Sequence, residues 1–202
     1  MKPRAGQSHQ RLGATRVFLC WAPITARAPF PKRRVGFRTD QASSPAQRTA
    51  AALYAALGPR HGRLRLRPKR RPQFRSAKGR RYAFSMSHSD GVVMLAWAQG
   101  FNLRLGVDLE RSTRKVRPGL ARKLPWNGQG LPYGHLTANW TALEAALKAD
   151  GRGLSGLGKV VATGNPWRLD RLAPGQGTLL LAPLKKAPRG FRATLALGKT
   201  RA

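Results

Sequence analysis

The sequence is poor in acidic residues. Only seven of its 202 residues are Asp or Glu, against 39 Lys or Arg, so the formal net charge is +32 at pH 7 and the pI is near 12.0. The long-range field of such a chain attracts anions: nucleic acid, phosphorylated metabolites, anionic lipid or an acidic protein. Charge alone does not choose among these partners.

The chain is equally poor in cysteine and in long apolar runs. Its single cysteine, Cys20, cannot form an internal disulfide, and one Cys with four scattered His offers no spacing for a zinc site. The longest apolar runs, VFLCWAPI and VVMLAWA, are far shorter than the ~20 residues that span a bilayer. The N-terminal stretch also lacks the apolar core of a secretion signal. We therefore expect a cytoplasmic protein that does not enter a membrane.

Local patterns predict several strands. Residues 1–15 are polar and without period, which predicts a loose leader, and a strand is expected over Val17–Ile24. The stretch YAFSMSHSDGVVMLAWAQGFNLRLGVDLE is apolar or alternating and breaks at Asp90-Gly91 and at Gln99-Gly100. This pattern predicts three consecutive strands joined by tight turns.

Two stretches carry helix signals. In SSPAQRTAAALYAALG, Ser44 is suited to the N-cap and Pro45 to the first turn. In TANWTALEAALKADG, Thr137 is the expected N-cap and Gly151 the expected end. Between strands and helices the chain is rich in Gly and Pro, which predicts loops.

The short stretch GVDLE, residues 106–110, holds two of the rare acids. In a strand, Asp108 and Glu110 point to the same face with Cα atoms roughly 6.5 to 7 Å apart, close enough for both to reach one cation. Two carboxylates at this spacing repel each other and need compensation. Either a divalent metal or basic neighbours can supply it, and the pair alone does not decide between them.

Two further stretches carry reactive groups. Glu144 lies in the second expected helix four residues before Lys148, a spacing that by itself indicates an ordinary ion pair worth a few tenths of a kcal/mol. SMSHSDG places His88 between two serines at a strand end. No GxSxG turn and no triad partner accompany it, so contact with phosphate suits this stretch better than hydrolase chemistry.

Taken in order, these motifs resemble those of the 4′-phosphopantetheinyl transferase superfamily, in particular the two-lobed type that activates carrier proteins. The matching text runs over Gln47–Leu154 and reads AQRTAAAL, RRP, FSMSHSD, GVDLE and WTALEAALKADGRGL. An ordered combination of motifs is more specific than any one of them. The chain departs from the family pattern at Leu143, where the family has a lysine, and at Ser85, where it has an asparagine. The segment 111–139 is also short and rich in Pro and Gly.

The resemblance implies a fold. We expect an α+β protein of two similar lobes, each a small antiparallel sheet with a packed helix, with the active site at their interface. The N-terminal lobe would cover residues 1–100 and the C-terminal lobe residues 101–202. Two lobes in one chain remove the need for a site shared between subunits, so we expect a monomer.

The resemblance also implies the roles of particular residues. It assigns a Mg²⁺ ion to three acids: Asp108, Glu110 and Glu144. It assigns contacts to the phosphates of coenzyme A to six residues: Arg48, Arg71, Ser87, His88, Ser89 and Lys148. Glu144 and Lys148 would be catalytic, the first as acceptor of a proton and the second beside the reacting phosphates.

The implied activity is Mg²⁺-dependent transfer of 4′-phosphopantetheine from coenzyme A to a serine of an acidic acyl or peptidyl carrier protein, with release of 3′,5′-ADP. A family member that binds carrier protein without catalysis is one alternative. Another is a basic nucleic-acid-binding protein that neutralises phosphates with the stretch Arg60–Arg81, which contains no acid.

Overall fold

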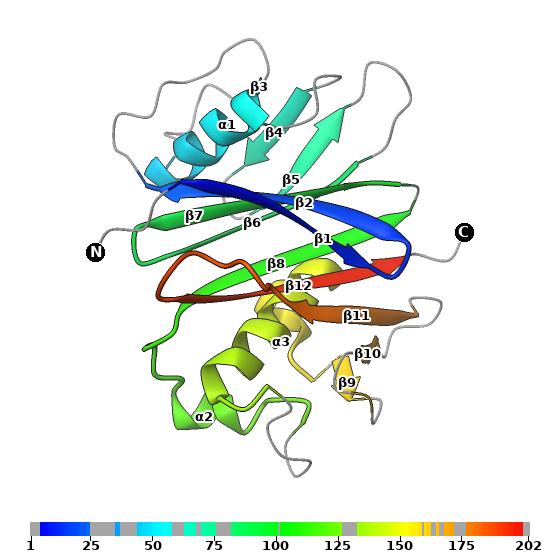
Figure 1. Ribbon diagram of the computed structural model, residues 1–202. Coiled ribbons are helices and arrows are strands. Elements are labelled where there is room, and N and C mark those ends of the chain that lie inside the picture. Colours follow the sequence, from blue (N-terminus) through cyan, green and yellow to red (C-terminus); the bar gives the residue numbers. More distant parts are fainter. Residues whose placement is uncertain are drawn as a thin grey trace. The chain divides into compact units, whose positions relative to one another are not determined.

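The structure is a computed structural model, and the chain divides into two compact units, Met1–Phe101 and Asn102–Ala202. Each unit contains an antiparallel sheet with a helix packed on it, which confirms the expected α+β fold with two lobes of this kind (Figure 1). No helix in the described part is long and apolar enough to cross a membrane. The structure describes residues 5–24, 35–36, 44–57, 63–67, 70–75, 82–100, 102–126, 133–158, 160–162, 165, 168–171 and 177–199.

The main sheet of the first unit has the strand order β1-β2-β7-β6, and all its neighbours are antiparallel. Its strands are β1 (Gly6–Leu12), β2 (Thr15–Pro23), β6 (Tyr82–Ser89) and β7 (Val92–Gln99). A second, small sheet has the order β3-β4-β5, formed by β3 (Val35–Gly36), β4 (Arg63–Arg67) and β5 (Arg70–Arg75).

The expectation of a loose leader over residues 1–15 is wrong for Gly6–Leu12, which forms β1. This strand pairs with β2 along its whole length, from Gly6 opposite Trp21 to Leu12 opposite Thr15. Its side chains alternate between half-buried and exposed, and only Leu12 is buried. An edge strand held by backbone hydrogen bonds can remain polar, so hydrophobic periodicity does not reveal it. The strand expected over Val17–Ile24 is present as β2.

Helix α1 (Pro45–Leu57) follows Ser44, the N-cap that its sequence predicts, and the cap is reciprocal. The Gln47 backbone N–H donates to the Ser44 hydroxyl at 3.2 Å, and the Ser44 N–H donates to the Gln47 side-chain oxygen at 2.9 Å. The helix packs on the sheet through a cluster of buried residues in which the Tyr54 ring meets the Phe84 ring edge-on at 5.7 Å. The other members are Cys20, Ala50, Ala51, Val93, Leu95 and Trp97.

The three strands expected between Tyr82 and Glu110 are present. β6 and β7 form a hairpin whose turn residues, Asp90 and Gly91, have φ of 42° and 76°, the left-handed conformation that a two-residue hairpin turn favours. The third strand, β8 (Leu103–Arg111), does not continue this sheet. It pairs with β12 (Phe191–Lys199) and belongs to the second unit.

The sheet of the second unit has the order β8-β12-β11-β10-β9. The remaining strands are β9 (Val160–Ala162), β10 (Arg168–Arg171) and β11 (Thr178–Pro183), and the helical elements are α2 (Pro118–Ala121), α3 (Leu136–Asp150) and the short 3-10 helix η1 (Gly153–Gly156). Helix α3 lies against the sheet through a buried cluster that includes Trp140, Leu143 and Leu147 (Figure 1).

The two ends of α3 differ in how well the sequence predicts them. Gly151 ends the helix with φ 104°, as expected. Thr137 is not the N-cap: that residue is His135, whose side chain makes no capping hydrogen bond. The Thr137 hydroxyl instead donates to the Arg114 backbone carbonyl at 2.6 Å, which ties the start of the helix to the segment that follows β8.

Candidate metal centre

The candidate centre forms where α3 crosses β8. The two elements come unusually close at Gly106, because a Cβ there would lie 1.9 Å from the Ala145 carbonyl oxygen and 2.6 Å from the Ala149 backbone nitrogen. Asp108 and Glu110 follow Gly106 at every second position of the strand, so they face the helix. The glycine thus allows the helix to lie directly over these two carboxylates.

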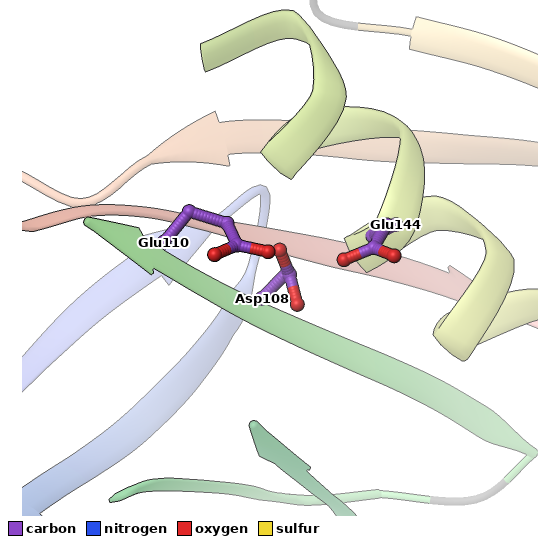
Figure 2. A group of neighbouring side chains, drawn as sticks. All are labelled: Asp108, Glu110 and Glu144. Carbon is purple, nitrogen blue, oxygen red and sulfur yellow. The ribbon is translucent and has the colours of Figure 1, made fainter. Parts of the chain in front are cut away.

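Three of the seven acids of the chain meet at this point. Asp108 and Glu110 come from β8 and Glu144 comes from α3, with their carboxylates turned toward one another (Figure 2). One oxygen from each lies within 4.8 Å of the others. Asp108 and Glu110 are only 2% and 3% exposed, and Glu144 is half-buried. The structure therefore brings together the three residues to which the resemblance assigns a metal.

Two cations also reach the cluster. The Lys148 ammonium donates to Asp108 Oδ1 at 2.6 Å, and the Arg114 guanidinium donates to Glu110 Oε1. The hydrogen bond to Glu110 raises the pKa of Arg114. Lys148 thus forms an ion pair with Asp108 on the strand and also lies one helical turn from Glu144. Its interactions are therefore not confined to an ion pair within α3.

The charge balance acts most strongly on Glu144. Burial raises the pKa of this carboxyl to about 8, and the neighbouring Asp108 charge adds to the effect, whereas the Lys148 charge opposes it. Without a bound cation, Glu144 therefore retains a proton at neutral pH. A divalent ion competes with that proton for the same oxygens.

Strand pairing adds two residues that sequence reasoning missed. On β12, Thr194 lies opposite Asp108 and Arg192 lies opposite Glu110, so both share the face that α3 covers. The Nε of Arg192 is buried and has no hydrogen-bond partner among the described residues. Arg114 was missed as well, although its position four residues after Glu110 is visible in the sequence.

The residues that the resemblance assigns to phosphate contacts, other than Lys148, belong to the first unit. Arg48 is half-buried on α1. On β6, His88 is exposed and shares the face that packs against α1, whereas Ser87, buried, and Ser89, half-buried, point to the opposite face. His88 and the two serines therefore do not form one cluster on the strand. Arg71 belongs to β5, whose side chains lie outside the described part of the chain.

The chain was compared with known proteins. No model of a protein family matches the sequence, and no curated protein matches it. The chemistry of this centre therefore rests on the residues themselves.

Proposed function

We propose that the protein is a Mg²⁺-dependent 4′-phosphopantetheinyl transferase that modifies a serine of an acidic acyl or peptidyl carrier protein. One observation carries the proposal: Asp108, Glu110 and Glu144, distant in sequence, converge within 4.8 Å. They lie in the two stretches, GVDLE and WTALEAALKADGRGL, that resemble the acidic motifs of that family. We infer a cytoplasmic monomer as part of the same proposal.

The donor set fits magnesium. Mg²⁺ prefers hard oxygen ligands at about 2.0 to 2.1 Å, so two of its ligands lie at most roughly 4.2 Å apart, and three oxygens within 4.8 Å of one another need only a small movement to reach one ion. When bound, the ion would neutralise charge on the pyrophosphate of coenzyme A. Lys148 would hold Asp108 in place and offer a positive charge beside the reacting phosphate.

In the proposed reaction, the hydroxyl oxygen of the carrier-protein serine forms a bond to the β-phosphorus of coenzyme A. The bond from that phosphorus to the leaving 3′,5′-ADP breaks, and the serine proton passes to Glu144. The net charge of +32 favours the approach of two anionic substrates.

Contacts to the substrate phosphates by Arg48, Arg71, His88 and the flanking serines Ser87 and Ser89 remain part of the proposal. They rest on the resemblance alone. Leu143 needs no role in catalysis, because its side chain is 1% exposed and packs in the core of the second unit. The family's lysine at this position therefore has a purely structural replacement here.

The test is a transfer assay. Purified protein, Mg²⁺ and coenzyme A are incubated with several apo carrier proteins of the acyl and peptidyl types, and mass spectrometry detects the added phosphopantetheine. Asp108→Ala should abolish the gain in mass. The matched control, Asp170→Ala, removes an exposed acid of the same unit and should retain activity. No gain on any carrier, while a known transferase modifies them in parallel, would reject the proposed activity.

The same variants separate the alternatives. An inactive family member would bind coenzyme A in a Mg²⁺-dependent way, lose that binding in Asp108→Ala and still transfer nothing. A nucleic-acid-binding protein would bind DNA or RNA with a steep salt dependence, and Asp108→Ala would leave that binding unchanged.

A further inference from the structure

The Arg114 side chain is partly in solvent and also contacts Glu110, a buried acid of the candidate metal centre. Its side chain is 50% exposed, whereas that of its partner Glu110 is 3% exposed. The backbone of Arg114 is held on two sides: its N–H donates to the Arg111 carbonyl at 2.9 Å, and its carbonyl accepts from the Thr137 hydroxyl at 2.6 Å. A fixed backbone with a half-exposed side chain lets the guanidinium turn into water while its Cα stays in place.

A divalent ion at the three carboxylates would place more positive charge beside Arg114 and Lys148. Lys148 is the more enclosed of the two cations, at 33% exposure, and comes from the helix that lies over the site. Arg114 can leave once the ion compensates Glu110, because the buried carboxylate then keeps a positive partner and water solvates the released guanidinium. Of the two cations, Arg114 is therefore the easier one to displace.

The ion also makes the site positive. With the three carboxylates ionised, the charges of Asp108, Glu110 and Glu144 are balanced by those of Lys148, Arg114 and Arg192, so the formal sum is 0. A bound divalent ion raises the sum to +2. An anion is thus attracted to the centre more strongly once the ion has bound, and the released guanidinium is then a donor suited to phosphate.

We propose that Arg114 is a displaceable counterion of the metal centre: it neutralises Glu110 while no ion is bound, and turns to a phosphate group of the substrate once a divalent ion occupies that carboxylate. This inference rests on the proposed function. It predicts ordered binding, with the ion before the phosphate ligand, and gives Arg114 a role that the sequence motifs do not assign.

The direct test is chemical modification of the full-length native protein with an arginine-specific dicarbonyl reagent, mapped by peptide mass spectrometry. Arg114 should be slow to react in the presence of a chelator, react severalfold faster with excess Mg²⁺, and slow again when desulfo-coenzyme A is added to the Mg²⁺ sample. Arg117, exposed on the same segment, is the internal reference and should react at one rate throughout. Equal reactivity of Arg114 with chelator and with Mg²⁺ would overturn the displacement.

Matched variants give a second readout. Arg114→Gln should bind Mn²⁺ about fivefold more tightly than wild type, because the competing cation is gone, and should bind desulfo-coenzyme A in saturating Mg²⁺ about fivefold more weakly. Lys115→Gln removes an exposed charge one residue away and should change either constant by less than about twofold. Weaker Mn²⁺ binding by Arg114→Gln would instead make Arg114 a residue that orients Glu110 for the ion.

The outcomes also separate this inference from the proposed function. Saturable Mn²⁺ binding with unchanged Arg114 reactivity rejects the displaceable counterion and leaves the metal centre standing. Absence of Mn²⁺ binding by the wild-type protein rejects both.

Discussion

In each unit a helix packs on an antiparallel sheet, but the side chains between helix and sheet differ in chemistry. In the first unit, α1 meets its sheet through apolar and aromatic side chains, with Tyr54 fully buried against Phe84. In the second unit, α3 meets its sheet through a similar apolar cluster, but beside it the helix also covers Asp108 and Glu110. Buried carboxylates cost free energy that apolar contacts do not, even when cations compensate them. The first unit shows that the arrangement does not need charges, so the acids of the second are better explained by function than by stability.

The close approach of α3 to β8 at Gly106 is where we expect a substitution to have the largest effect. Gly106→Ala should destabilise the protein by about 4 kcal/mol or more, because the new Cβ would overlap backbone atoms of Ala145 and Ala149 that no side-chain rotation can move. Thermal and urea denaturation measure the effect. Gly119→Ala is the control: nothing lies within 4 Å of the position that a Cβ would take there, and the change should stay within about 0.5 kcal/mol. Equal stability of the two variants would mean that α3 does not approach β8 as described.

The second prediction concerns pH. Because the pKa of Glu144 is raised to about 8 in the folded chain, the folded state holds a proton that the unfolded state releases near pH 4.5. The free energy of unfolding of the metal-free protein should therefore fall between about pH 4.5 and 8, by up to about 5 kcal/mol, and then level off. Glu144→Gln stays neutral and should lack this component of the decline.

Urea denaturation of both proteins in chelator, from pH 5 to 9, measures the difference. Saturating Mg²⁺ should restore the stability of the wild type at pH 8 and leave Glu144→Gln nearly unchanged, because the ion replaces the proton only where a third carboxylate is present. Parallel pH curves for the two proteins would show that Glu144 is not buried among like charges.

The sequence predicts the parts of the fold that depend on local signals. The N-cap at Ser44, the Asp90-Gly91 turn and the glycine end of α3 at Gly151 are all present. Elements that depend on distant partners were missed or misassigned. β1 is a polar edge strand, and Thr137 lies inside α3, where its hydroxyl donates to the Arg114 carbonyl. Neither partner is visible in a local window of sequence.

In the candidate site, too, local signals could be read from the sequence and distant partners could not. The alternation in GVDLE places Asp108 and Glu110 on one face, and the motif order brings in Glu144, so the acids could be named from the sequence. Arg192 could not, because nothing local specifies that β12 pairs with β8 or that this residue falls opposite Glu110. The sequence also left open whether metal or basic neighbours compensate the acids. The structure adds two basic neighbours, Lys148 on Asp108 and Arg114 on Glu110.

The smallest expected effect lies at the two helix starts. Ser44→Ala removes a cap that α1 uses and should cost about 1 kcal/mol. His135→Ala changes the N-cap of α3, which makes no side-chain hydrogen bond, and should cost less than about 0.5 kcal/mol. Denaturation of both variants in parallel measures the contrast. A larger loss of stability in His135→Ala than in Ser44→Ala would contradict the expectation that α1 depends on a side-chain cap and α3 does not.

The central claim is that Asp108, Glu110 and Glu144 share one divalent ion, and a Mn²⁺ titration followed by electron paramagnetic resonance tests it most directly. We expect one saturable site in the wild-type protein, a loss of affinity of about a hundredfold or more in Asp108→Asn, and a change of less than about twofold in Asp170→Asn, which alters an exposed acid outside the cluster. Absence of a saturable site, or equal affinities for the two variants, would contradict the claim.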